Sequence, residues 1–507
     1  MNVREALSRV PSPFWAHQTP RFWQDVHIAE ALYLFGEFPV SANGTVRWRD
    51  AAGAPRVAER HPHFERTTAE TPIPPTQFWR VVRENRFRRP AQRGLVDRYD
   101  DSGRPLLIAL GFRLLGGISP FLFFWLGPLL AVPVLFWAGG ELWRAGHART
   151  GVVLMLLIGS WPFLAEALAL SYSTAGFQVL ALLIAVPLAS YAALSPRPRP
   201  AGLLLRSAVA GTLLAACVLA RGGALLTVAA PALAVGLGAW RVAGGGGRPR
   251  ALRAAGILGA GLLLLGLPYL GARMAVGRLI ARTAAQYGRT EVAPQQHALW
   301  FGLWTGLGDF DREKGYRWLD EAASEAAVAA GGTRLRSAGY DAVNEAVYRR
   351  LILADVEADP LWYGGILLRR LFAVVTQRKL WPWPPLSGRS TAPARHRNEG
   401  VIDAYYALVA PADQLGIGRW RLEIPVPLLA LPAATVLVWA ARRRDPCWPG
   451  RGLVLFAVAV GALPLPVFVT TAGAIEPQAF VLVYLLALAF LAEALPPQRH
   501  PGGAQTR

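Results

Sequence analysis

Four charged side chains lie where they could act together on one substrate, and they are Asp25, Glu166, Arg221 and Glu476. Arg221 is an isolated positive charge between two apolar runs, and an arginine fork makes bidentate contacts with phosphate oxygens. Glu166 and Glu476 lie at the ends of other apolar runs, and Asp25 is the first candidate from the N-terminal segment. Together they predict a polar rim that binds a phosphate-bearing or sugar substrate. Taken singly, each is better explained as an ordinary helix-end residue that reaches water.

The composition shows that these charges stand in a membrane protein. Of the 507 residues, 53% are hydrophobic and only 17% are charged, and the mean hydropathy is +0.30. So little charge cannot coat the surface of a soluble domain, and apolar runs of about 18 or more residues recur along the chain. We therefore predict an all-α polytopic membrane protein.

The net charge of +20 comes almost wholly from arginine, since lysine occurs only at Lys314 and Lys379. Much of this arginine lies in loops between apolar runs, where the positive-inside rule places it. The charge therefore indicates membrane lipids or phosphate-bearing substrates as partners and argues against nucleic acid. No residues have metal-ligand spacing, so we expect no resident metal or cofactor, although the sequence leaves a divalent ion open.

The apolar runs predict about nine membrane spans, six before the long central polar stretch and three after it. They lie at residues 118–139, 150–171, 174–195, 203–220, 223–241, 252–272, 422–441, 451–470 and 476–495. The long apolar stretch from 203 to 241 is divided at Arg221-Gly222-Gly223, where the glycine pair predicts a turn.

Loop charge predicts the orientation of every span, because basic residues fall on alternate loops. These residues are Arg144, Arg149, Arg197, Arg199, Arg206, Arg241, Arg248, Arg250, Arg253, Arg442, Arg443, Arg444, Arg451 and Arg499. The positive-inside rule makes their side cytoplasmic and puts Glu166, Arg221 and Glu476 on the extracytoplasmic face. The composition, rich in arginine, alanine, glycine and proline, is typical of a GC-rich bacterial genome, so we expect a bacterial inner (plasma) membrane.

The same topology predicts five parts. Residues 1–117 form an extracytoplasmic N-terminal segment, 118–272 a bundle of about six helices, 273–421 an extracytoplasmic loop domain with an interfacial helix, 422–495 three further helices, and 496–507 a cytoplasmic tail. A polar N-terminal segment normally follows a membrane anchor, so we expect a first helix upstream of Met1; a short form held in another way is the alternative.

The central stretch 273–421 is rich in aromatic residues and carboxylates. Trp300, Trp304, Asp309, Asp311 and further aromatic residues lie within about twenty positions of one another. Aromatic faces stack on sugars while acids bind their hydroxyls, so Trp304 and Asp309 are candidate substrate-binding residues. A membrane-interface helix anchored by tryptophan explains the pattern equally well.

The N-terminal segment from Phe22 to Gly36 predicts a helix closed by Gly36, with Asp25 near its start. This segment and several later stretches follow, in the same order, a pattern found in a known superfamily. The matching residues are Asp25, Ala29 and Tyr33, then Gly36 to Gly44, Gly103 to Leu107, Arg113 to Gly116, Pro162 to Glu166, and Leu219 to Gly223. Between residues 22 and 275 the chain thereby resembles GT-C glycosyltransferases, in the branch of the protein O-mannosyltransferases and aminoarabinose transferases.

The resemblance implies a GT-C-like helical bundle and a lipid-linked sugar donor, with the sugar on a polyprenyl phosphate. It implies Asp25 as the general base that takes a proton from the acceptor hydroxyl, and Arg221 as the group that holds the donor phosphate. Tyr33, Glu166 and Glu476 would contact the substrate. The sequence departs from the family at Val26, where a second acid is common, and the acids at Asp97, Asp100 and Asp101 remain alternative bases.

Three functions follow from this pattern. The first is a membrane glycosyltransferase that moves a sugar to an extracytoplasmic glycan, lipid or protein acceptor. The second is a non-catalytic GT-C-like scaffold of envelope assembly, which would explain Val26. The third is a transporter of lipid-linked sugars. Transporters usually carry ionisable groups or broken helices near mid-bilayer, and the predicted spans are clean at their centres, which argues against this third function.

Overall fold

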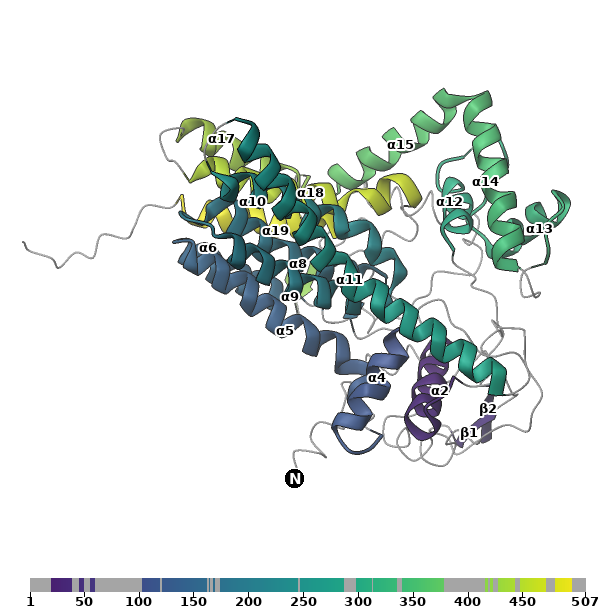
Figure 1. The fold of residues 1–507 in the computed structure, drawn as a ribbon. Helices are drawn as coiled ribbons and strands as arrows, with labels where there is room; N and C mark the ends of the chain where they lie inside the picture. The colour runs from purple at the N-terminus through teal and green to yellow at the C-terminus, as the bar shows by residue number, and fades with distance from the viewer. Residues whose placement is uncertain are drawn as a thin grey trace, which may run out of the picture.

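The protein is almost entirely helical in a computed structural model, drawn as a ribbon in Figure 1. The structure describes residues 20–38, 45–49, 55–59, 103–118, 121–161, 164, 167–168, 174–244, 247–286, 298–311, 313–334, 340–377, 415–417, 420–422, 427–442, 447–470 and 479–494. Within these ranges the strands form two short antiparallel hairpins. They are β1 (Thr45–Arg49) with β2 (Pro55–Glu59), and β3 (Leu415–Ile417) with β4 (Trp420–Leu422).

Six helical segments of the described chain are long and apolar enough to cross a membrane, as expected of a multi-pass membrane protein. They are α5 (Phe121–Arg144), α8 (Thr174–Leu194), α9 (Pro200–Ala220), the 3₁₀ helix η2 (Gly222–Val228) with α10 (Ala229–Ala243), α11 (Arg248–Gln286), and α18 (Trp448–Ala462) with the π-helix η4 (Leu465–Val469). Three shorter apolar helices overlap the other three predicted spans. They are α6 (Ala148–Gly159), α17 (Ala430–Ala441) and α19 (Val481–Ala492).

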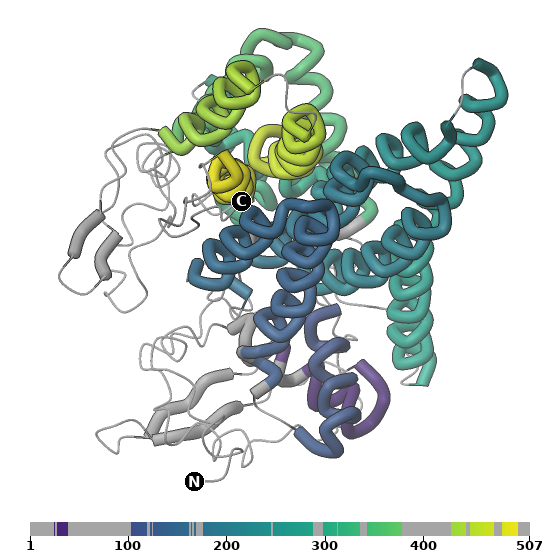
Figure 2. Tube along the Cα trace, turned by 90° about the vertical axis from the view of Figure 1, so that its left-hand side faces the viewer, coloured from purple at the N-terminus to yellow at the C-terminus, as the bar shows by residue number. Residues whose placement is uncertain are grey.

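Helix α8 forms the centre of the bundle. In its apolar stretch of 18 residues 83% of the residues are buried, against 17% in the corresponding stretch of α11 at the periphery. Helices α5, α9, α10 and α18 pack around α8, and α19 is buried along nearly its whole length. Figure 2 looks toward the bundle from the side of α6 and α17, and the yellow α19 is seen nearly end-on among the other helices. Glycines allow close helix contact: a side chain at Gly211 would overlap the backbone of α11 at Leu264 and Leu265.

One end of the bundle gathers the arginines that the topology assigns to one side. Arg206 of α9 makes a bidentate contact with Glu141 of α5, with Nη2 to carboxylate oxygen distances of 2.8 and 2.9 Å. Arg241 of α10 donates to the carbonyl of Ala192 at the end of α8. Arg442, after α17, donates to the carbonyl of Ala494 beyond α19. The ends of α5, α8, α10 and α17 therefore lie on one side of the molecule, here called the basic end.

The N-terminal helices lie at the opposite end, here called the Arg221 end. Helix α2 (Pro20–Phe35) and helix α4 (Gly103–Leu114) pack against the distal part of α11, as Figure 1 shows. Their shared core consists of Ile28, Leu32, Phe38, Ala109, Ile280 and Ala284. The Phe38 amide also donates to Thr283 Oγ1 at 3.2 Å, which fixes the end of α2 to α11. Gly36 follows α2 with φ +70°, so the predicted glycine stop is confirmed.

Four helices between the two groups of apolar helices share a core of their own. They are α12 (Leu299–Leu307), α13 (Asp320–Ala329), α14 (Tyr340–Ala358) and α15 (Pro360–Val375). Helix α15 returns to the bundle, because Val374 belongs to the bundle core and its carbonyl accepts a hydrogen bond from the Tyr484 hydroxyl. The predicted boundary after residue 272 falls inside α11, which continues unbroken to Gln286.

Candidate functional site

Asp25 forms a buried ion pair with Arg104. Asp25 lies in the second turn of α2 with 2% of its surface exposed, and Arg104 is the second residue of α4. The Arg104 Nε atom is 3.4 Å from Asp25 Oδ2, and Arg104 Nη2 donates to the Phe123 carbonyl of α5 at 2.8 Å. One guanidinium therefore holds α2, α4 and α5 together and fixes the Asp25 carboxylate. We did not predict a role for Arg104 from the sequence, because the N-terminal segment contains many other arginines.

Close packing of α4 on α9 brings this ion pair to the Arg221 end. Gly103, next to Arg104, lies against Leu219 so tightly that a Cβ atom would overlap both the side chain and the backbone of Leu219. Arg221 follows two residues later, is 7% exposed, and ends α9 with an extended backbone before η2 begins. The chain of contacts from Asp25 through Arg104 and Gly103 to Leu219 therefore connects Asp25 with the turn that carries Arg221. The break between the two apolar helices falls where the glycine pair predicted it.

The start of η2 contacts two further elements of the bundle. An ideal Cβ at Gly223 would lie 3.6 Å from Gln178 Nε2 of α8 and 3.6 Å from a methyl group of Leu465 in η4. Arg221 therefore lies two residues before a position that contacts both α8 and η4. Gln178 was not predicted from the sequence; its signal is a lone amide near the start of a mostly apolar helix.

Asp309 is part of a buried joint between α12, α15 and η4. Asp309 and Arg370 are both fully buried, with Arg370 Nε 3.7 Å from Asp309 Oδ2, and the Thr470 hydroxyl donates to the same oxygen at 3.0 Å. Arg370 also donates to the carbonyls of Val467, at 3.3 Å, and Gly306. Burial lowers the pKa of the Arg370 guanidinium from its ordinary value, and the Asp309 carboxylate opposes that shift. The interfacial helix predicted from the sequence covers residues 361–378 and contains Arg370, but this side chain is enclosed by protein.

The aromatic residues of the central stretch form a packed core. Trp304 is buried, with its ring centroid 5.1 Å from that of Tyr316 and 6.1 Å from that of Tyr348. Tyr33 lies half-buried with the edge of its ring against Phe112, at 5.7 Å between centroids. Packing covers the Trp304 ring because the apolar residues of α12, α13 and α14 close around it. The predicted sugar-stacking role therefore has no exposed Trp304 face in this conformation.

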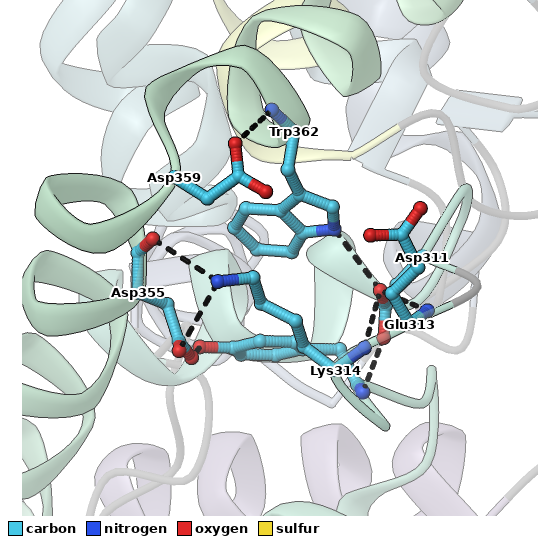
Figure 3. Close-up of polar contacts among 7 residues, drawn as sticks. Asp311, Glu313, Lys314, Asp355, Asp359 and Trp362 are labelled. Atoms are coloured by element: carbon cyan, nitrogen blue, oxygen red, sulfur yellow. Dashed lines mark hydrogen bonds and ion pairs between the residues drawn. The ribbon is translucent and has the colours of Figure 1, made fainter.

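The loop after Asp309 is held in place by the polar cluster drawn in Figure 3. Asp311 Oδ1 accepts from the amides of Glu313 and Lys314, both at 3.0 Å, and from Trp362 Nε1 at 3.1 Å. Asp311 Oδ2 accepts from the Tyr316 amide at 2.7 Å. Burial raises the pKa of Asp311, but these four hydrogen bonds outweigh it, so the net shift is downward.

A second carboxylate completes this cluster. The Tyr316 hydroxyl donates to Asp355 Oδ2 at 2.6 Å, and Lys314 Nζ lies 3.5 Å from Asp355 Oδ1 and 4.8 Å from the centre of the Trp362 ring. Burial and then the hydrogen bond to Asp355 raise the pKa of Tyr316 far above its ordinary value, so the phenol remains a donor. These polar groups attach the loop to α14 and α15, so the described contacts give the cluster a structural role.

Several predicted residues have no described geometry. Glu166, Glu476 and the acids Asp97, Asp100 and Asp101 lie outside the described residues. Among the residues that the structure describes, no group of three or more His, Cys, Asp or Glu side chains could hold a metal ion. No protein-family model, curated protein or solved structure matches this chain.

Proposed function

We propose that the protein is a membrane glycosyltransferase that moves a sugar from a polyprenyl-phosphate donor to an extracytoplasmic acceptor. The observation that supports the proposal is the connection between Asp25 and the Arg221 turn, made by the Asp25–Arg104 ion pair and the contact between Gly103 and Leu219. A carboxylate and an arginine are the two groups that this transfer needs, one for the acceptor proton and one for the donor phosphate.

In this proposal each side chain has one task. Asp25 takes the proton from the acceptor hydroxyl as that oxygen attacks the anomeric carbon of the sugar. Arg104 is a positioning residue that holds the Asp25 carboxylate through their ion pair. Arg221 binds the phosphate and stabilises the negative charge that grows on the polyprenyl phosphate as it leaves. The Arg221 end faces the extracytoplasmic side, because the arginines of the basic end follow the positive-inside rule.

The test is release of polyprenyl phosphate by the purified protein in lipid vesicles. Polyprenyl-phosphate-linked mannose, glucose and arabinose are supplied with an envelope extract as the source of acceptors. Asp25→Asn should lower release by about 10²- to 10⁴-fold, the usual contribution of a general base. Glu313→Gln, which alters an exposed carboxylate of the central loop, should leave the rate unchanged. Full activity in Asp25→Asn would exclude this residue as the base.

A non-catalytic scaffold is the second candidate function, and a specific observation favours it. Asp25 is already ion-paired, and the Trp304 ring is covered by tyrosines, so both have structural partners. A scaffold would release no polyprenyl phosphate from any donor, and Asp25→Asn would instead lower its thermal stability and its recovery from membranes.

A further inference from the structure

Gln178 carries a buried amide without a hydrogen-bond partner, close to Arg221. Only 1% of its surface is exposed, and neither Nε2 nor Oε1 has a partner among the described residues. Its Nε2 atom lies 3.6 Å from the position of a Cβ at Gly223, two residues after Arg221. The amide is therefore directed at the first turn of η2, where α9 ends.

Such an amide is unusual inside a membrane bundle. Nearly all buried polar side-chain atoms in proteins have a hydrogen-bond partner, and one that lacks a partner calls for an explanation. Polar residues among transmembrane helices are costly and commonly mark binding sites. The neighbours of Gln178 on α8 are the apolar Phe177 and Val179, so neither adjacent side chain competes for the amide.

The chemistry of the amide restricts its ligand. Nε2 donates and Oε1 accepts, and both are unpaired within the described part of the chain, so the ligand must offer an acceptor and a donor. A phosphate dianion offers acceptors alone and would leave Oε1 unpaired. Sugar hydroxyls both donate and accept, so neighbouring hydroxyls of one ring satisfy both atoms of the amide. Arg221, in contrast, offers donors alone, which suits phosphate.

We infer that Gln178 is a specificity-determining residue that binds hydroxyl groups of the donor sugar while Arg221 binds the adjoining phosphate. This inference rests on the proposed function and adds the part of the donor that each side chain recognises. The two groups come from different helices, α8 and the end of α9, and η2 joins them by a van der Waals contact at Gly223. A glycosyl phosphate, in which ring hydroxyls and phosphate are close neighbours, matches this pairing.

The test compares lipids with and without the sugar. Binding of polyprenyl phosphate, and of polyprenyl-phosphate-linked mannose, glucose and arabinose, is measured on the full-length protein in nanodiscs. Arg221→Met should weaken the binding of all of these lipids. Gln178→Leu should lower the affinity for the preferred sugar-bearing lipid by about 10- to 100-fold, to near the affinity for polyprenyl phosphate. The affinity for polyprenyl phosphate itself should not change. Gln178→Met serves as a second variant of similar volume.

Thermal stability supplies an independent measurement. Gln178→Leu should raise the unfolding temperature, because the substitution removes two unpaired buried polar atoms. Ser190→Ala is the matched control: Ser190 Oγ is likewise buried and unpaired on α8, but about three turns nearer the basic end. Ser190→Ala should also raise the unfolding temperature, without any change in lipid binding.

The outcomes separate the inference from the function on which it rests. Equal loss of affinity for all lipids in Gln178→Leu, or no loss, would overturn the sugar contact while leaving the glycosyltransferase in place. The sugar contact is also overturned if the unaltered protein binds no sugar-bearing lipid more tightly than polyprenyl phosphate. If the unaltered protein binds none of the four lipids, the proposed function itself fails.

Discussion

The buried pair of Arg370 and Asp309 should be the main polar attachment of α12–α15 to the bundle. Arg370→Met keeps the length of the side chain but removes the charge and the donors to Val467 and Gly306, and it takes the positive charge away from the Asp309 carboxylate. Because both side chains are fully buried, Arg370→Met should lower the free energy of unfolding by about 3–5 kcal/mol, the usual effect of removing one partner from a buried pair.

A matched control lies one residue away. Arg369 is exposed and donates to the Phe310 carbonyl at 3.3 Å, so Arg369→Met removes the same side chain from the same helix. Its effect should stay near about 1 kcal/mol, because that hydrogen bond is partly exposed to water. The double variant Arg370→Met with Asp309→Asn removes both buried charges, and it should be more stable than the sum of the two single changes by about 0.5–3 kcal/mol.

Hydrogen exchange at the amides of α12 and α15 is the suitable assay, because it reports the free energy of opening of these helices separately from the bundle. Tryptophan fluorescence during heating follows global unfolding in parallel. Equal loss of protection in Arg370→Met and Arg369→Met would refute the argument, since burial of the pair would then contribute nothing. Strict additivity in the double variant would show that the two side chains do not interact.

Two further substitutions test packing and pH dependence. Gly103→Val should push α4 off Leu219, lower stability by about 1–3 kcal/mol and weaken release of polyprenyl phosphate, whereas Gly117→Val, with open space around it, should do neither; equal effects would contradict the contact. Asp311→Asn should destabilise the protein at pH 7. The difference in unfolding temperature between this variant and the unaltered protein should disappear as the pH falls below about 4. The pKa of Asp311 is lowered on folding, so its ionised form stabilises the fold above the unfolded value of about 3.9 and loses this effect on acidification. Unfolding temperatures from pH 7 to pH 3 measure this, and a constant difference would contradict it.

Topology explains why part of the site could be predicted from the sequence. The ends of apolar helices are set by chain length and by loop charge, so Arg221 could be assigned to the end opposite Arg206 and Arg241. The helix around Asp25 and its glycine stop also follow from local pattern. These features depend on residues near one another in sequence.

Features that depend on contacts between distant segments could not be predicted in this way. Arg104 pairs with Asp25 from a different helix, far earlier in the chain, and Arg370 resembles an interfacial arginine until η4 encloses it. Helix α11 runs past its predicted boundary because α2 and α4 cover its distal part, which hydropathy alone does not show. Trp304 has the composition of a sugar platform, but α13 and α14 use it as core.

The length of α11 sets the height of the N-terminal helices above the bundle. Its 39 residues form a rod of about 58 Å, nearly twice the hydrocarbon thickness of about 30 Å. Helices α2 and α4, and with them Asp25, pack on the distal part of α11. One residue inserted into α11 before this part would turn the packing surface by about 100° and move it by about 1.5 Å along the helix axis. The hydrogen bond between the Phe38 amide and Thr283 would then break. The length of α11 therefore sets how far α2, with Asp25, lies from the basic end of the bundle.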